Sequence, residues 1–212
     1  MKTMRVAITI LFFSLFIGAF AQDTTSHAGF YAQLNASRLW VTSSPKSTAN
    51  VQSVAQWSAG GGVYWMSRLR NNVRFELQLG YESTGSGREI YFVTANSLTR
   101  VYDRYRTVST VAIARVRLPF WQRLNIGGGI KSNLVINHEV RNKAIMSSPP
   151  SVIIISPDVK RLILSGIAEM VVTFPKAEIG IQAWYGFIPL IEENNTKVNA
   201  SGLSLTVKAY IW

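Results

Sequence analysis

The sequence contains no cysteine and only two histidines among its 212 residues. The absence of cysteine excludes a disulfide framework, a thiolate zinc site, an iron–sulfur cluster and a cysteine nucleophile. Two histidines leave few ligands for a metal centre. We therefore expect neither a metal nor a cofactor.

Charged residues and long apolar runs are also scarce. Charged side chains make up 16% of the chain, below the roughly 25% that is typical of soluble domains. After the N-terminus, no segment is long and apolar enough to span a bilayer as a helix, which takes about 20 consecutive apolar residues. Hydrophobic residues nevertheless make up 48% of the chain. They must therefore be spread along it in short or alternating patterns.

Residues 1–21 have the pattern of a secretory signal peptide. Lys2 and Arg5 give a positive start, residues 6–16 form an apolar core, and small residues precede Gln22. A membrane-anchor helix is the alternative, but the apolar run is short and a cleavage-type site follows it. Residues 22–212 are then one exported domain.

Beyond residue 28 the dominant pattern is strict alternation of apolar and polar residues, which is typical of β-strands. In residues 73–82, for example, every odd position is apolar or aromatic and every even position is polar or glycine. The same pattern predicts eight strands, at residues 29–41, 55–66, 73–82, 108–118, 124–136, 162–174, 178–187 and 203–212.

Short and long connections between these strands alternate along the chain. The short ones are residues 67–72, 119–123 and 175–177, and the long ones are 42–54, 83–107, 137–161 and 188–200. Two long connections are predicted to contain hairpins of their own, 88–95 with 98–106 and 143–146 with 152–155. An even number of strands with short turns at one end and long loops at the other is the plan of an outer-membrane barrel. The predicted fold is therefore all-β: an eight-stranded antiparallel up-and-down transmembrane β-barrel after a signal peptide.

The polar face of these strands carries charges of both signs. An eight-stranded barrel has room inside only for side chains, and unlike charges packed there can pair. We therefore predict that the polar face points inward and the apolar face outward. The predicted interior charge network comprises Arg74, Glu76, Glu82, Arg115, Arg117, Lys131, Glu169, Glu178 and Lys208.

Bulky aromatic residues lie near the strand ends. Phe30 and Trp40 are ten residues apart on the apolar face of the first strand, which spans about 25 Å at about 3.3 Å per residue and a tilt near 40°. That is the height of the apolar band of an outer-membrane barrel, where aromatic girdles mark both interfaces. The predicted girdle residues are Phe30, Trp40, Trp57, Trp65, Tyr81, Phe120 and Trp121.

Three segments resemble the small outer-membrane β-barrel proteins labelled PorT-like: the FELQLGY strand at residues 75–81, the glycine triplet at 127–129, and the terminal LSLTVKAYIW at 203–212. The resemblance covers the chain from about Ala28 to Trp212. It implies a barrel fold and an outer-membrane location. None of the three segments is a catalytic motif, so the resemblance implies no activity.

Catalytic chemistry has few candidates. Some eight-stranded barrels edit lipid A with a histidine, but His27 lies at the start of the exported chain. His138 shares the outward parity of Ser132, and about 20 Å of strand separates them, too far to form a nucleophilic pair. We predict no enzymatic activity. A lipid A-modifying enzyme that pairs His138 with a loop residue, a narrow channel, and a soluble secreted ligand-binding barrel remain the alternatives.

Basic residues in the long loops suggest partners. Arg100, Arg104 and Arg106 have even spacing on one predicted strand and share the outward parity of Val108, with Tyr102 in the same row. Guanidinium groups match phosphate oxygens bidentately, so these arginines are candidate contacts for lipopolysaccharide phosphates. The expected partners are outer-membrane lipid, the barrel-assembly machinery during insertion, and an envelope protein, but not nucleic acid. The predicted role is structural, adhesive or interactive, with periplasmic termini and extracellular loops.

Overall fold

The computed structural model describes residues 26–41, 49–70, 72–92, 97–144, 161–193 and 196–211. The predicted signal peptide, residues 1–21, lies outside the described residues. So does most of the hairpin predicted within residues 143–155. None of the described residues forms a helix long and apolar enough to cross a membrane.

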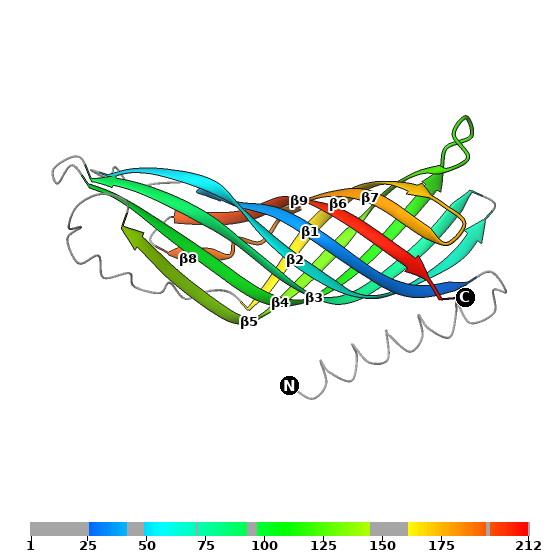
Figure 1. The fold of residues 1–212 in the computed structure, drawn as a ribbon, viewed down its shortest axis with the longest axis horizontal. Helices are drawn as coiled ribbons and strands as arrows, with labels where there is room; N and C mark the ends of the chain where they lie inside the picture. Colours follow the sequence, from blue (N-terminus) through cyan, green and yellow to red (C-terminus); the bar gives the residue numbers. More distant parts are fainter. Residues whose placement is uncertain are drawn as a thin grey trace.

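The described residues form one antiparallel sheet that closes on itself (Figure 1). The strands are β1 (His27–Val41), β2 (Ala49–Arg70), β3 (Val73–Phe92), β4 (Ser97–Arg117), β5 (Leu124–Ala144), β6 (Leu162–Thr173), β7 (Ala177–Gly186), β8 (Ile191–Glu193) and β9 (Thr196–Tyr210). Neighbouring strands pair in chain order, and β1 pairs with β9 from Gly29↔Tyr210 to Val41↔Val198. The short β8 pairs only with β9. The fold is therefore an eight-stranded closed β-barrel, as predicted, with one additional short strand.

The two ends of the barrel differ. The short turns β2–β3, β4–β5 and β6–β7 lie at the end where β1 begins and β9 finishes, which is the right-hand end in Figure 1. We call it the short-turn end and the opposite end the long-loop end. The three predicted short connections do lie together at one end. The predicted long connection 83–107 is wrong, because β3 continues to Phe92 and β4 begins at Ser97.

Four neighbouring strands are much longer than predicted. β2 to β5 have 20 to 22 residues each, whereas β6 has 12 and β7 has 10. β3 and β4 stay paired without interruption from Val73↔Val116 to Phe92↔Ser97. The segments 88–95 and 98–106 are thus mostly continuations of barrel strands and not a separate hairpin. At the long-loop end, β2 to β5 extend past the ends of the shorter strands. We call these extensions the projecting sheet; they are residues 49–55, 86–92, 97–106 and 137–144.

Side chains alternate between a buried polar side and an exposed apolar side. In β7, Glu178 and Gln182 are buried, while Ile179 and Ile181 are 45% and 51% exposed. This is the inverse of a soluble barrel, whose apolar side chains point inward. The alternative of a soluble ligand-binding barrel is therefore wrong for these strands.

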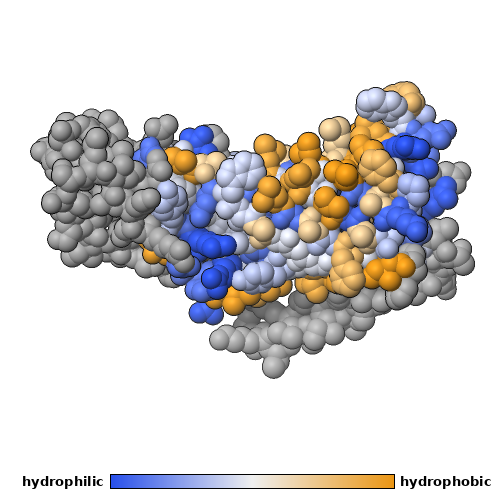
Figure 2. Space-filling model, in the orientation of Figure 1, coloured by the Kyte–Doolittle hydropathy of each residue, from blue (hydrophilic) through white to orange (hydrophobic). Residues whose placement is uncertain are grey.

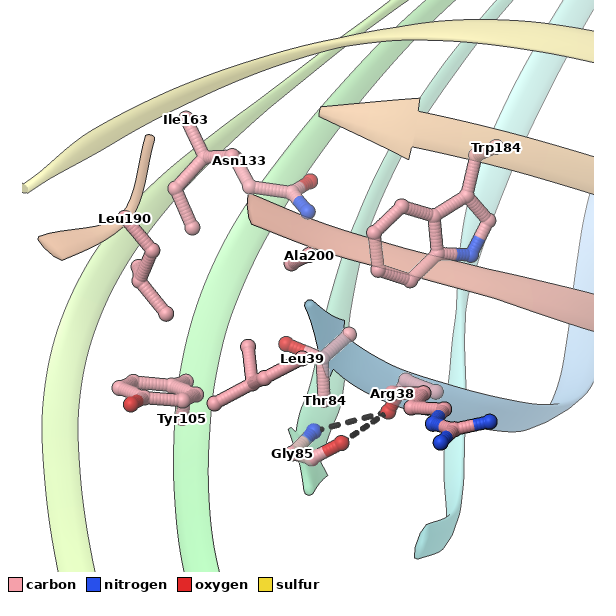
Figure 3. Close-up of a pocket in the computed structure, with 11 residues that line it drawn as sticks. Arg38, Leu39, Thr84, Gly85, Tyr105, Asn133, Ile163, Trp184, Leu190 and Ala200 are labelled. Carbon is pink, nitrogen blue, oxygen red and sulfur yellow. Dashed lines mark hydrogen bonds between the residues drawn. The ribbon is translucent and has the colours of Figure 1, made fainter. Parts of the chain in front are cut away.

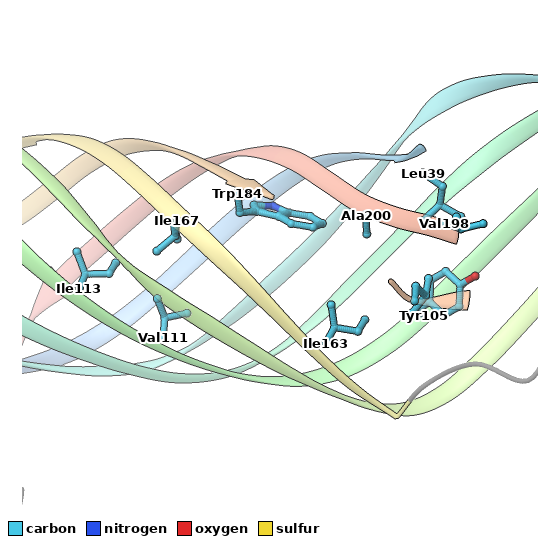
Figure 4. Close-up of a cluster of buried hydrophobic side chains, with 10 residues drawn as sticks. Leu39, Tyr105, Val111, Ile113, Ile163, Ile167, Trp184, Val198 and Ala200 are labelled. Atoms are coloured by element: carbon cyan, nitrogen blue, oxygen red, sulfur yellow. The ribbon is translucent and has the colours of Figure 1, made fainter. Parts of the chain in front are cut away.

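A cluster of apolar side chains nevertheless occupies the lumen toward the long-loop end (Figure 4). We call it the apolar cluster. Its members come from five strands and from the segment after β7; they are Leu39, Tyr105, Val111, Ile113, Ile163, Ile167, Trp184, Leu190, Val198 and Ala200. The alternation of apolar and polar residues did not predict this cluster. The lumen therefore contains two different kinds of core.

One glycine is required by a close approach along the inner wall of the barrel, from β1 over β2 to β3. A Cβ at Gly80 would collide with the hydroxyl of Tyr31, which crosses from β1 and is 5% exposed. Glycine in a strand interior often marks such an approach. The ring of Tyr31 also packs with Tyr64 and Met66, and these three residues form a second, smaller buried cluster.

Candidate functional site

Arg115 is the centre of the charged part of the lumen. It points inward from β4, is 1% exposed, and reaches carboxylates on three other strands. Its Nη2 lies 2.5 Å from Glu76 Oε2 and its Nη1 lies 2.7 Å from Glu178 Oε2, while its Nε donates to Glu169. One guanidinium group therefore links β3, β4, β6 and β7 through the inside of the barrel.

Lys208 adds a fifth strand to this network. Its Nζ lies 2.5 Å from Glu76 Oε1 and 3.9 Å from Glu169 Oε2. Two glutamine side chains donate further hydrogen bonds to these carboxylates. Gln78 donates to Glu76 Oε1 at 2.5 Å, and Gln182 donates to Glu169 Oε2 at 3.0 Å. Buried charges are tolerated when they are paired and hydrogen-bonded, and these groups satisfy that condition.

A separate ion pair lies further along the lumen. Lys131 Nζ is 2.7 Å from Glu82 Oε1 and 2.8 Å from Glu82 Oε2, and Gln33 also donates to that carboxylate. The same ammonium lies 5.0 Å from the centroid of Trp184, a member of the apolar cluster. Lys131 therefore marks the boundary between the charged and the apolar parts of the lumen.

The remaining two residues of the predicted interior network lie at the short-turn end. Arg74 is half-buried, with its Nη1 3.9 Å from Glu178 Oε1. Arg117 is half-buried as well and forms no ion pair with any described residue. The structure thus brings seven of the nine predicted charges into close pairs, holds Arg74 at a longer distance, and leaves Arg117 outside the network. The glutamines were missed, although they occupy the same inward positions of their strands.

The predicted girdle residues lie on the outside of the barrel where their side chains are described. Trp65 is half-buried, and the structure describes Trp40 only through its backbone in β1. The exposed members are Phe30, Trp57, Tyr81, Phe120 and Trp121. Their role at a membrane interface remains a prediction.

His138 lies on the inside of the barrel and not on the outside as predicted. A β-bulge shifts the register between β4 and β5, because Arg106 pairs with Asn137 and Thr107 pairs with Val135. One extra residue turns the following side chains to the other face. His138 therefore points inward, stacked on Tyr105 at 4.6 Å between ring centroids, with its Nε2 3.4 Å from Asp103 Oδ1. The predicted outward parity was wrong, and the outward-facing Ser132 is not its partner.

The three predicted lipopolysaccharide contacts lie along β4. Arg106 is exposed and Arg104 is half-buried, with its Nε donating to Ser83 Oγ at 2.8 Å. Tyr102 and Val108 are half-buried on the same face. The structure describes Arg100 only through its backbone, opposite Glu89 and Lys143.

A small cavity lies within the apolar cluster (Figure 3). Its volume is about 10 Å³, which is room for about one water molecule. The Ser37 hydroxyl closes one side by donating to Gly85 O at 2.6 Å and accepting from Gly85 N at 2.9 Å. Ile163, Trp184 and Leu190 form much of the remaining wall. This cavity is too small to hold a substrate.

The fold and the lumen together define a closed eight-stranded barrel with a charged, filled interior and an apolar exterior. No protein-family model matches the chain, and no curated protein matches it. The PorT-like name therefore has no matching family model behind it and remains a prediction.

Several solved structures resemble the chain. Neisserial surface protein A is 16% identical with a TM-score of 0.40, over 86% of this chain and 97% of that one. The outer membrane protein OprG from Pseudomonas aeruginosa is 11% identical with a TM-score of 0.38, over 87% and 93%. Ail, the attachment invasion locus protein of Yersinia pestis, solved with the heparin analogue sucrose octasulfate, is 10% identical with a TM-score of 0.37, over 88% and 99%.

Proposed function

We propose that the chain is a non-enzymatic integral outer-membrane barrel whose lumen is plugged and whose projecting sheet contacts partners outside the cell. The observation that carries the proposal is the inverted distribution of polarity. Fully buried charges such as Arg115 and Glu76 fill the interior, while large apolar side chains such as Ile130 are 60% exposed. A bilayer is the environment that favours this distribution.

The exposed apolar side chains form a band of suitable height. β7, the shortest of the eight barrel strands, has 10 residues, and about 9–11 tilted residues span an outer membrane. Figure 2 shows hydrophobic residues gathered over the part of the barrel toward the short turns, with hydrophilic residues on either side of them. The band includes Leu34, Val63, Leu79, Ile130, Leu134, Met170, Ile181, Leu203 and Leu205.

The projecting sheet supports the interaction role. β4 has 21 residues, or about 70 Å of strand, which rises about 50 Å at a tilt near 40°. The apolar band takes up about 25 Å of this. The rest extends beyond the bilayer, and short-turn ends of such barrels face the periplasm. The projecting sheet is then extracellular and both described ends of the chain are periplasmic.

Lipopolysaccharide is the partner we propose for the base of the projecting sheet. Arg104 and Arg106 lie on its outer face, directly beyond the apolar Val108, with Tyr102 in the same row. In the proposed orientation, lipid A phosphates lie at this height, and an arginine guanidinium group can donate two hydrogen bonds to phosphate oxygens. The test is to replace Arg100, Arg104 and Arg106 with Gln and measure thermal unfolding in vesicles with and without lipopolysaccharide. Equal stabilisation of wild type and variant would contradict the contact.

Membrane insertion is tested first by fractionation of the expressed protein together with heat-modifiable gel migration. A soluble, heat-indifferent protein would contradict the barrel assignment in the membrane. A depth series then locates the band: Leu77→Arg, near the middle of the proposed apolar band, should cost about 2–4 kcal/mol of folding free energy, whereas Val73→Arg, at the turn, should cost about 0–1 kcal/mol. Refolding titrations into phosphatidylcholine vesicles measure both. Equal costs would show that the predicted depth is wrong.

A further inference from the structure

The pairing of β2 with β3 is interrupted at the base of the projecting sheet. Regular pairs end at Ala55↔Ser86 and resume at Gly60↔Glu82, so β2 has one more residue than β3 between these two points. An extra residue of this kind makes a β-bulge, which re-aims side chains. Trp57 lies in the bulge, and its side chain is 69% exposed on the outside of the barrel.

Ser83 connects this bulge to two arginines of β4. Its backbone oxygen accepts a hydrogen bond from Ser58, the neighbour of Trp57, and its hydroxyl accepts one from Arg104 Nε at 2.8 Å. Arg106 is the register partner of Ser83 on β4. Trp57 and the two arginines therefore flank Ser83 from opposite sides, about 10 Å apart, which is two strand spacings.

Both arginines can bind an anion. Arg106 is exposed, and the hydrogen bond to Ser83 orients the Arg104 guanidinium group while leaving its two terminal nitrogens for other acceptors. No described residue forms an ion pair with either arginine, and this includes Glu139, the register partner of Arg104 on β5. A donor that is already oriented loses less side-chain freedom when it binds.

The outer surface next to these residues, toward the short turns, is apolar. Tyr81 on β3 pairs with Val108 on β4, and Leu79 follows along the same face of β3. Tyr81 and Leu79 are exposed there and Val108 is half-buried. A ligand that covers both surfaces needs an anionic headgroup and acyl chains, so it is an anionic lipid.

We propose that Trp57, Arg104 and Arg106 form one site, the sugar–phosphate site, for the phosphorylated sugar headgroup of lipid A. The terminal N–H groups of the arginines donate to phosphate oxygens. The indole ring packs against the C–H face of the sugar, a use suited to an amphipathic aromatic side chain between an apolar and a wet region. This inference rests on the proposed contact with lipopolysaccharide and adds the sugar to it.

The site should therefore be selective. A phospholipid such as phosphatidylglycerol has the phosphate but no ring for Trp57 to cover, and a neutral glycolipid has the ring but no phosphate for the arginines. Lipid A has both groups. Specificity is the difference between these affinities, and the aromatic side chain is the part of the site that separates lipid A from other anionic lipids.

The experiment uses the full barrel folded in zwitterionic phosphocholine micelles. Lipid A, phosphatidylglycerol or a neutral glucosyl diacylglycerol is titrated into the micelles at constant ionic strength. Heat-modifiable migration follows the unfolding temperature, whose rise with lipid concentration gives an apparent affinity. The variants are Trp57→Leu, which keeps an apolar side chain, Trp57→Phe, which keeps an aromatic ring, and Arg104→Gln with Arg106→Gln.

Two matched controls change similar side chains at the short-turn end. Trp121→Leu removes a tryptophan that is 67% exposed, nearly the same as Trp57. Arg123→Gln with Lys176→Gln removes two exposed positive charges. In the proposed orientation these positions lie at the opposite interface, so neither control should alter the response to lipid A in a way that resembles the variants of the sugar–phosphate site.

We expect the wild type and both controls to respond to lipid A at lower concentrations than to either other lipid. The arginine variant should lose about tenfold or more in affinity for lipid A, because hydrogen bonds to charged groups are lost. Trp57→Leu should lose about three- to tenfold, whereas Trp57→Phe should keep most of the affinity. A side chain that served only as an apolar membrane anchor would be replaced equally well by leucine.

Equal affinities of the wild type for lipid A and phosphatidylglycerol would overturn the inference, and this comparison decides if Trp57→Leu does not fold. An unchanged response in Trp57→Leu, together with a lost response in the arginine variant, would overturn the sugar contact and leave the proposed lipopolysaccharide contact intact. A membrane-inserted wild type without any response to lipid A would overturn both.

Discussion

Arg115 and Tyr105 both point into the lumen from β4, ten residues apart, and their surroundings are opposite in kind. Arg115 contacts carboxylates from β3, β6 and β7. Tyr105 stacks on His138 and belongs to the apolar cluster with Leu39. The part of the lumen toward the short turns is therefore held by charge, and the part toward the long loops by packing.

The difference teaches how each part should respond to substitution. In the charged part, the stability that a group provides depends on its partners, because a lone charge left in a dry lumen is worse than no charge. In the apolar part, a smaller side chain costs its buried area and the cavity it leaves. Lys131, which contacts Glu82 on one side and the Trp184 ring on the other, lies where the two regimes meet.

The largest effect is expected from Arg115→Met. The change leaves Glu76, Glu169 and Glu178 in the lumen with Lys208 as their main remaining cation. Removing one partner of a single buried pair costs about 3–5 kcal/mol, so we expect at least that loss. Denaturant titration in phosphatidylcholine vesicles measures it. Adding Glu169→Gln should restore part of the stability, and a double variant less stable than the single one would contradict the charge network.

Lys131→Met and Glu82→Gln test the isolated pair at the boundary. Each single change should cost about 3–5 kcal/mol, because it leaves one buried charge, and the double change should cost less than either single change. A double-mutant cycle in the same vesicles gives the coupling energy. Additive costs would show that the two groups do not depend on each other, and measurable ion conductance by the wild type would show that the lumen is not plugged.

Ile163→Val should have a smaller effect, in the apolar part. Ile163 is 3% exposed and lines the small cavity, so the lost methyl group should cost about 0.5–1.5 kcal/mol. Ile130→Val is the matched control, because Ile130 is 60% exposed on the outside of the barrel, where lipid replaces the lost contacts. The same vesicle titrations compare them. If both changes cost the same, Ile163 does not belong to a packed core.

Much of this contrast follows from the sequence, but not all of it. Period-two alternation places Glu76, Glu178 and Lys208 on inward faces, and the same rule locates β6 to within one residue at its end. Pairing does not follow, since Arg115 meets residues 39, 54 and 63 positions away in the chain. Which residues meet inside the barrel depends on how far neighbouring strands are shifted along each other. The alternation of apolar and polar residues contains no information about that shift.

Two features escaped prediction for local reasons. The β-bulge opposite Arg106 reverses the parity of β5, so His138 was assigned to the wrong face. The apolar cluster escaped because Val111, Ile113 and Trp184 share the inward faces of their strands with charged and polar residues such as Arg115, Glu178 and Gln182. Apolar residues on a polar face were the available signal. They indicate where the interior changes from charge to packing.

The smallest effect is expected from Arg104→Gln, which compares an arginine with Arg115 on the same strand but on the opposite face. Arg104 is half-buried on the outside, and its Nε donates a hydrogen bond to Ser83 Oγ at 2.8 Å. Glutamine can donate a similar bond, and single hydrogen bonds contribute about 0.5–1.5 kcal/mol, so the change should cost less than about 1 kcal/mol. Denaturant titration in vesicles without lipopolysaccharide measures it, because that lipid would add the proposed phosphate contact. A cost close to that of Arg115→Met would place Arg104 in a dry environment, and would mean that parity along β4 does not separate the lumen from the outer surface.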